Sequence, residues 1–436
     1  MNHPTPKTGS DPALSPAQLA ARGVWLAVLR HQAATVTAQL DSGQWNFLAD
    51  EALRYQLGGL TYRLLTDGPL PERVPAAVQQ RLRAQYVDSA VQNAVYLRGT
   101  RRIAAALTGA GIPVLLLKGV HLCRFVYAEP ALRSMADVDL MVPRDRLAEA
   151  ERIALALGYG PVPRPDLEEF CSRWHHLAKL YKPGAPVLEV HWTIERPVSP
   201  FRIDLAGLWS RARPATLEGV PVLLLAPEDL LLHVALHGSY HHGFNWSALK
   251  GVVDLDVVVA KHGAELDWGV FAERANAWGV SGFIYTALRL ATTILHTPIP
   301  APVFDALRHE PADDAVVELA RRHVLSTHLE LPETYLALAR DRGLRGRWKL
   351  LRHAVFLPRE AMERLYGPRR GAAALYPSFL RRVVDLLGRR SRLLFHALLK
   401  TKTLHSALER EANRDQIKGW VKRASGGRMS IGPEPK

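Results

Sequence analysis

The most informative segment in this chain of 436 residues is Ala136-Asp137-Val138-Asp139-Leu140-Met141-Val142. Its apolar and β-branched residues predict a strand from Val138 to Val142. Because side chains alternate between the two faces of a strand, Asp137 and Asp139 are expected to project from the same face. Two carboxylates held side by side repel each other, so the pair predicts a cation site, and Mg²⁺ suits clustered carboxylates. The alternative is a strand end with two solvated aspartates.

The segment before this strand adds a glycine and two cations. A buried strand over 112–117 is predicted to run into Gly119 and then into a helix over 119–127. A glycine at that point lets the backbone approach a phosphate, and the N-terminus of a helix supplies N–H donors and positive potential. Lys118 and Arg133 are close to the strand pair in sequence and are expected to bind a triphosphate.

The segment after it supplies a third carboxylate. Two further strands, near 177–182 and 187–194, are predicted to flank a hairpin turn, and the second of them carries Glu189. If that strand pairs with the first, Glu189 joins the two aspartates, and three acids beside a glycine-led helix describe a two-metal phosphoryl-transfer centre. His191 alternates to the same face, where it contacts either the nucleotide or Glu189, or is a hydrogen-bonded core histidine.

The order of elements predicts an α+β fold with a small mixed sheet enclosed by helices. Helical patterns cover 17–40, 46–66, 75–85, 87–110 and 144–157, the last ending at Gly158, and they resume after Pro227; the last predicted strand ends at residue 194. The expected divisions are a disordered leader (1–16), an N-terminal helical region (17–110), the αβ core (111–219), a helical domain (220–339) and a basic helical C-terminal region (340–436).

The net charge of +14 is concentrated in one region. Residues 340–436 hold 24 Lys/Arg and 8 Asp/Glu, whereas the other 339 residues have a net charge of −2. The simplest interpretation of the basic region is a helical cap over the αβ core or a docking face for an acidic partner. Peripheral contact with an anionic membrane surface is an alternative. No nucleic-acid-binding motif is present, so nucleic acid is not an expected partner.

The remaining composition points to a cytoplasmic protein. The two cysteines, Cys123 and Cys171, are far apart, which excludes a disulfide framework and fits a reducing compartment. Residues 1–16 lack the apolar core of a signal peptide. The longest apolar candidate, Val220 to Leu236, is interrupted by Glu228 and Asp229, so no membrane span is predicted.

Several short motifs together resemble the uncharacterised nucleotidyltransferases of the DNA polymerase β superfamily. The resemblance covers roughly residues 50–300 and rests on Leu116-Leu117-Lys118-Gly119, the run from Arg133 to Val142, Leu188-Glu189-Val190-His191-Trp192, the helix Leu230 to Gly238, and Val252-Val253-Asp254. It implies that Asp137 and Asp139 bind two Mg²⁺ ions, with Mn²⁺ as a possible substitute, and that Glu189 completes the site. The implied reaction transfers a nucleoside monophosphate from an NTP to an acceptor on a small molecule, a sugar or a modified peptide.

Other residues and functions have competing interpretations. His233 and His237 are four residues apart, a spacing that can bind zinc, but the absence of a HExxH pattern favours substrate contact or a plain helix face. Asp254 is expected to be an interhelical or surface residue, and Trp174-His175-His176 a structural strand start. The alternative function is a catalytically silent, nucleotide-binding or scaffold protein that binds a partner through its basic tail. The three intact acids argue against it.

Overall fold

The computed structural model of the protein describes residues 14–32, 39–67, 73–160, 167–241, 244, 248–307, 314–326 and 419. The described residues from Leu14 to Leu325 belong to one compact unit. The first 13 residues of the predicted leader and, apart from Gly419, the predicted basic C-terminal region lie outside the described residues. In the ranges that are described, no helix is long and apolar enough to cross a membrane.

Four helices precede the sheet: α1 (Pro16–Leu29), α2 (Ser42–Arg54), α3 (Gly58–Thr66) and α4 (Ala76–Gly109). Ser15 starts α1 through a capping box with Gln18. The prediction of a single helix over 46–66 is wrong. Gln56 adopts a left-handed φ of 59°, and this break separates α2 from α3. The two segments predicted over 75–85 and 87–110 form one helix of 34 residues, because no glycine or proline lies between them.

The described residues form one mixed sheet, which confirms the α+β class. Its strands are β1 (Leu115–Leu116), β2 (Asp137–Met141), β3 (Val187–His191), β4 (Arg213–Leu217) and β5 (Val220–Leu224), in the order β3-β2-β1-β5-β4. The β2–β3 and β1–β5 pairs are parallel and the other two are antiparallel. The segment predicted as a strand over 177–182 makes only isolated bridges, among them Leu180 with Leu188.

The strands β4 and β5 extend the sheet beyond the last strand predicted from sequence. Pro214 and Pro221 weaken the strand pattern there, because proline cannot donate to a β-ladder. Pro214 is tolerated because β4 is an edge strand, whereas Pro221 of the inner strand β5 precedes Leu223 and Leu224, the residues that pair with β1. The hairpin turn between the two strands has left-handed backbone at Glu218 (φ 47°) and Gly219 (φ 84°), as tight β-hairpin turns require.

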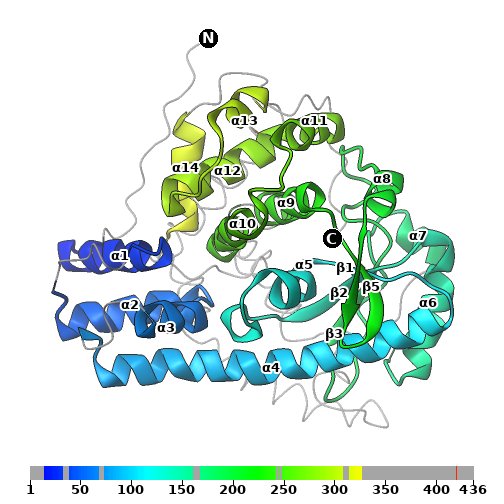
Figure 1. Cartoon of the computed structure of the whole chain (residues 1–436), viewed down its shortest axis with the longest axis horizontal. Coiled ribbons are helices and arrows are strands. Elements are labelled where there is room, and N and C mark those ends of the chain that lie inside the picture. Colours follow the sequence, from blue (N-terminus) through cyan, green and yellow to red (C-terminus); the bar gives the residue numbers. More distant parts are fainter. Residues whose placement is uncertain are drawn as a thin grey trace, which may run out of the picture. The chain divides into compact units, whose positions relative to one another are not determined.

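The sheet lies between two apolar clusters, one on each face. Val138, Leu140, Leu188 and Val190 pack on one face with residues of α4 and of α6 (Leu147–Ala156). On the other face, Leu115, Leu117 and Met141 belong to a cluster formed by the N-terminal helices together with the C-terminal helices. In Figure 1, α4 runs past α2 and α3 with its first half and past β5 and α6 with its second half. Asp139 and Glu189 therefore belong to the face opposite α4.

The segments between the strands are short helices. They are α5 (Lys118–His121) with a π-helix over Leu122–Val126, 3₁₀ turns over Pro130–Leu132 and Arg144–Arg146, α7 (Leu167–Cys171) and α8 (Leu205–Ser210). The helix predicted over 119–127 is thus an α-helical turn followed by a π-helix. The helix predicted over 144–157 is confirmed, and Gly158 follows it in the left-handed region (φ 87°).

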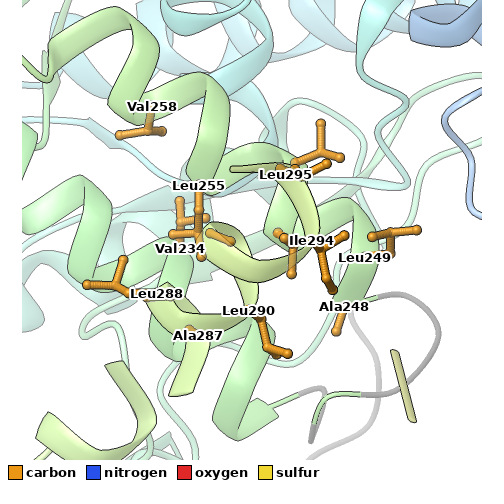
Figure 2. Packing of buried hydrophobic residues seen from close by; sticks show 14 of the residues in the cluster. Val234, Ala248, Leu249, Leu255, Val258, Ala287, Leu288, Leu290, Ile294 and Leu295 are labelled. Atoms are coloured by element: carbon orange, nitrogen blue, oxygen red, sulfur yellow. The ribbon is translucent and has the colours of Figure 1, made fainter. Parts of the chain in front are cut away.

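The C-terminal half of the described chain is helical, as predicted after Pro227. Its elements are α9 (Pro227–Leu236), a π-helix over His237–His241, α10 (Ala248–His262), α11 (Trp268–Trp278), α12 (Ser281–Leu295), α13 (Ala301–Ala306) and α14 (Asp314–Val324). Figure 2 shows Val234 of α9 beside Leu255 of α10, with Leu288 of α12 close by. Burial of such side chains contributes roughly 1.5–3 kcal/mol each.

A buried ion pair connects this helical half to the segment before β2. Arg133 donates from Nε and Nη2 to the two carboxylate oxygens of Asp254, at 2.7 and 2.9 Å, and the hydroxyl of Tyr127 donates to the same carboxylate at 2.7 Å. Asp254 and Arg133 are 4% and 9% exposed. Asp254 is therefore the interhelical residue that the sequence predicted, and it satisfies the guanidinium of Arg133.

We expect Asp254→Ala to lower the free energy of unfolding by about 3–5 kcal/mol, because it leaves the buried guanidinium of Arg133 unpaired. Tyr127→Phe removes one hydrogen bond and should cost only about 1 kcal/mol. Urea unfolding of the two variants measures both values, with Asp145→Ala at an exposed position as the control. Equal effects of Asp254→Ala and Asp145→Ala would contradict this account of the pair.

Candidate active site

Two of the three acids face each other across the β2–β3 ladder. The strands are parallel, and the register pairs Asp139 directly with Glu189 and Met141 with His191. Because alternate residues share a face, Asp137, Asp139, Glu189 and His191 all belong to the same face of the sheet. Asp139 and Glu189 are 1% and 5% exposed, and His191 is fully buried. The predicted pairing of the two strands is confirmed.

Lys118 is the direct cationic partner of Asp139. Its Nζ lies 2.8 Å from Oδ1 of Asp139, and the Leu117 amide donates to the Asp139 carbonyl at 3.2 Å. Lys118 adopts a left-handed φ of 38°, a conformation that costs energy for a residue with a side chain and that is concentrated at functional sites. Burial opposes ionisation of Asp139, but Lys118 and His191 hold its pKa well below the usual range.

Glu189 is surrounded by groups that favour its charged form. Nζ of Lys179 forms an ion pair with Oε1, and ring nitrogens of His191 and His176 lie 3.6 and 3.9 Å from Oε2. Burial raises the pKa of this carboxyl, but His191 and Lys179 outweigh it and lower the pKa to about 2. Glu189 is therefore ionised across the physiological range, which suits a cation ligand better than a proton acceptor.

Asp137 differs from its two neighbours because it has no cationic side chain in direct contact among the described residues. Burial, together with the charges of Asp139 and Glu189, raises its pKa to about 6. The like-charge repulsion that the sequence predicted for the aspartate pair is thus concentrated on one member. Lys118 and Lys179 lower this pKa only in part. A carboxylate so placed gains from the arrival of a cation.

A cluster of histidine rings continues from the acids to the C-terminal helices. The ring centroids of His175 and His191 are 5.1 Å apart, those of His175 and His241 are 5.4 Å apart, and His237 lies 5.4 Å from His241. His176 contacts both His175 and His191. Nε2 of His241 lies 3.0 Å from the buried carboxylate of Glu195. His237, expected to contact the nucleotide, is in this cluster.

His233 lies at the buried end of the cluster, next to His237. The two ring centroids are 6.5 Å apart, and neither ring nitrogen of His233 has a hydrogen-bond partner among the described residues. Burial, with the charges of Lys118 and His191, holds its pKa well below the usual range. Burial likewise lowers the pKa of His176 to about 4. The imidazoles of His233 and His176 are therefore neutral at pH 7.

The structure brings most of the predicted site residues together, but two lie elsewhere. Lys118 and His191 contact Asp139 directly. Arg133 instead binds Asp254, and Gly119 packs against the side chains of Arg133 and Met135, 3.2 Å from where a Cβ would lie. The predicted roles of these residues toward a nucleotide stay predictions.

Three groups near the acids were missed by sequence reasoning. Lys179 had no motif around it, and His175 with His176 was interpreted as a structural strand start. Lys250 of α10 donates to Oε1 of Gln56 at 2.9 Å and to the Ser134 carbonyl at 3.4 Å. Burial, and then the charge of Arg133, lowers its pKa to about 8, whereas the charges of Asp254 and Asp137 oppose this shift. Polar residues within apolar segments were the available signal for all three.

The donor set fits a divalent cation. Asp139, Glu189 and His191 each offer one ligand atom, and these atoms lie within 4.8 Å of one another. Two carboxylate oxygens and an imidazole nitrogen suit ions from Mg²⁺ and Mn²⁺ to Zn²⁺, and Asp137 beside them adds a further carboxylate. Only the described residues were compared, and among them this is the one such group. His191, expected to contact nucleotide, thus joins the residues able to hold the ion.

We expect asparagine to have opposite effects on stability at the two aspartates of the metal-free protein. Asp137→Asn removes an unfavourable charge and should raise the free energy of unfolding at pH 7 by on the order of 1–2 kcal/mol. Because the folded pKa of about 6 exceeds the ordinary 3.8, this gain should be absent below pH 4 and complete above pH 6. Asp139→Asn leaves Lys118 without its carboxylate and should cost about 3 kcal/mol.

Urea unfolding in EDTA at pH 4 and pH 7 measures both effects. Equal gains in stability in the two variants would contradict the opposite effects and show that the repulsion predicted from sequence acts on both aspartates alike. Loss of stability in Asp137→Asn at pH 7 would show that this carboxylate has a structural partner.

Comparison with known proteins identifies a family. A family model described as an uncharacterised nucleotidyltransferase matches residues 41–296. The matched segment begins one residue before α2, ends one residue after α12 and contains the three acids together with the histidine cluster. No curated protein and no solved structure matches the chain.

Proposed function

The chain belongs to the uncharacterised nucleotidyltransferase family, and from this premise we propose that it moves a nucleoside monophosphate from an NTP to an acceptor and releases pyrophosphate. A nucleotidyltransferase role in general follows from the family. The observation that carries the finer proposal is the direct pairing of Asp139 with Glu189 across β2 and β3, with His191 within reach of both. Buried acids on neighbouring strands are the arrangement that metal-dependent phosphoryl transfer needs.

Asp139 and Glu189, with His191 beside them, would hold the first divalent cation, and Asp137 would contribute to a second. We propose Mg²⁺, with Mn²⁺ as a substitute that the imidazole would tolerate well. Bound cations neutralise charge on the phosphates and polarise the bond that breaks. Lys118 keeps Asp139 ionised and fixes its orientation at 2.8 Å.

The chain's own cations would hold the triphosphate. Lys250 contacts the Ser134 carbonyl, three residues before Asp137, and with a pKa of about 8 its ammonium is mostly charged at pH 7. It takes the phosphate-binding role that the sequence analysis gave to Arg133. The unpartnered ring nitrogens of His233 and the Nδ1 of His175 are neutral donors or acceptors for the base, the sugar or the acceptor.

In the proposed reaction, a lone pair on the acceptor attacks the α-phosphorus, and the bond between that phosphorus and the pyrophosphate oxygen breaks. The pyrophosphate leaves with the electron pair of the broken bond, and the acceptor's proton passes to a carboxylate or to water. Positioning and charge neutralisation would supply most of the rate enhancement. A hydroxyl, amine or phosphate on a small molecule, a sugar or a modified peptide is a compatible acceptor.

The experiment that tests this function compares NTP binding with and without metal. Each of the four NTPs is screened by thermal unfolding in the presence of Mg²⁺ or Mn²⁺. We expect at least one of them to stabilise the protein strongly. Saturation at 100 times Kd contributes about 2.7 kcal/mol. The same NTP in EDTA should stabilise it much less, because three carboxylates then face the triphosphate. Equal shifts with metal and with chelator would contradict the metal-dependent site.

A further inference from the structure

A cavity of about 360 Å³ lies between the second half of α4, the C-terminal end of α6 and the turn over 182–186 that leads into β3. Its lining contains three cationic side chains, Arg98, Arg102 and Lys182, and no carboxylate. Cavities of this size are typical of small-molecule sites. We propose that this cavity, here called the α4 cavity, binds the phosphate group of a small-molecule ligand.

The two arginines lack an anionic partner in the described part of the chain. Arg98 and Arg102 are one helical turn apart on α4, where like charges repel each other, and both are exposed. Neither forms an ion pair or hydrogen bond with a residue in the described part of the chain. By contrast, the neighbouring Arg101 donates to the Glu218 carbonyl at 3.0 Å and lies 4.0 Å from its carboxylate. An anion between the two arginines would remove their repulsion.

The third cation approaches the α4 cavity from the turn before β3. Nζ of Lys182 donates to the Leu157 carbonyl at the end of α6, at 2.6 Å, and lies 5.9 Å from the centroid of the Tyr159 ring. An ammonium has three donors, so this contact leaves two for a ligand. Burial raises the pKa of the Tyr159 phenol, and the positive charge of Arg102 on α4 partly opposes this rise.

The rest of the α4 cavity is apolar, and its shape depends on a glycine. A Cβ at Gly99 would lie 3.0 Å from Cδ of Pro186, so glycine allows the turn to pack closely against α4. Ile103, Leu157 and Pro186 supply apolar walls. Guanidinium groups match phosphate oxygens bidentately, which favours phosphate over a spherical anion such as chloride. A compact phosphate monoester with an apolar portion fits this combination.

The α4 cavity is separate from the candidate active site. It lies on the side of the sheet covered by α4 and α6, where Leu188 and Val190 point. Glu189 and His191 alternate to the opposite face. The proposal therefore does not rest on the proposed transfer reaction. Pro186 in its wall is three residues from Glu189, so an occupied cavity also contacts the segment that carries an acid of the active site.

The test uses the full chain in EDTA, with inorganic phosphate and phenyl phosphate as probes at constant ionic strength set by chloride. Isothermal titration measures both dissociation constants for the wild type, Arg98→Ala/Arg102→Ala and the matched control Arg101→Ala. Asp139→Asn is included because it removes charge from the active site alone. All four proteins keep the basic region 340–436, so its contribution to anion binding is the same in each.

We expect the wild type, Arg101→Ala and Asp139→Asn to bind both probes alike, with phenyl phosphate the tighter. Binding should fall at least tenfold in Arg98→Ala/Arg102→Ala, whose fold is checked by its melting temperature in chloride alone. Lys182→Met should weaken binding in the same direction. The proposal is overturned if the arginine variant binds as the wild type does, if Arg101→Ala loses as much, or if the wild type shows no binding beyond that of chloride. Altered binding in Asp139→Asn would assign the anion to the active site instead.

Discussion

Asp139→Asn is expected to reduce nucleotidyl transfer at least about a thousand-fold, which corresponds to about 4 kcal/mol of lost transition-state stabilisation. Asp139 is the most buried of the three acids and contacts both Lys118 and His191 at 2.8 Å. It is also part of the group able to hold a cation. The change of one oxygen to nitrogen keeps the shape but removes the charge that would balance the cation.

The measurement is transfer of label from an α-³²P-NTP to components of a cell extract, with Mg²⁺ or Mn²⁺. Asp145→Asn, an exposed aspartate four residues after β2, is the matched control and should keep full activity. Because Asp139→Asn is also expected to lose stability, circular dichroism at the assay temperature has to show a folded protein. Wild-type transfer by folded Asp139→Asn would remove this residue from the proposed mechanism.

Glu189→Gln is expected to have the second-largest effect, a loss of about 10²–10⁴-fold in transfer. Two roles are conceivable for Glu189 in the proposed reaction, a base for the acceptor's proton and a cation ligand. The structure favours the ligand role, because Lys179 and His191 lower the pKa of this carboxyl to about 2 and leave it a weak base. Glu189→Gln should therefore weaken the metal-dependent binding of NTP as well as turnover.

Binding of Mn²⁺ followed by electron paramagnetic resonance separates the two roles without an acceptor. Glu218→Gln, in the exposed turn between β4 and β5, serves as the control. Loss of Mn²⁺ affinity in Glu189→Gln, similar to that in Asp139→Asn, would establish the ligand role. Normal Mn²⁺ and NTP binding with slow turnover would instead establish the base, and rescue at higher pH should then follow. If Glu189→Gln alters neither ligand binding nor turnover, Glu189 is excluded from the site.

The sequence alone determined those features that depend on neighbours along the chain. The period of two in a strand places Asp137 and Asp139 on one face whatever surrounds them, and β2 confirms the strand. The order of strands and helices indicated the α+β class in the same way. The short motifs around Lys118, Asp139 and Glu189 sufficed for the family, because each is a local run of residues that the family model also covers.

Tertiary structure alone decided which distant groups meet. Asp139 contacts Lys118 and His191, which are 21 and 52 residues away along the chain. Arg133 forms its ion pair with Asp254, which is 121 residues away. No local pattern encodes such pairings, because they depend on how strands and helices pack.

The same physical reason explains the differing acids and the missed strands. Asp137 and Asp139 look alike in sequence, yet one has a raised pKa and the other a lowered one. Among the described residues, Asp139 is the one of the two that Lys118 and His191 contact directly. The strands β4 and β5 carry prolines that weaken a local strand signal. They form because β5 pairs with the distant strand β1, and β4 pairs with β5. Local periodicity fixes where a side chain points. Long-range packing fixes what it meets there.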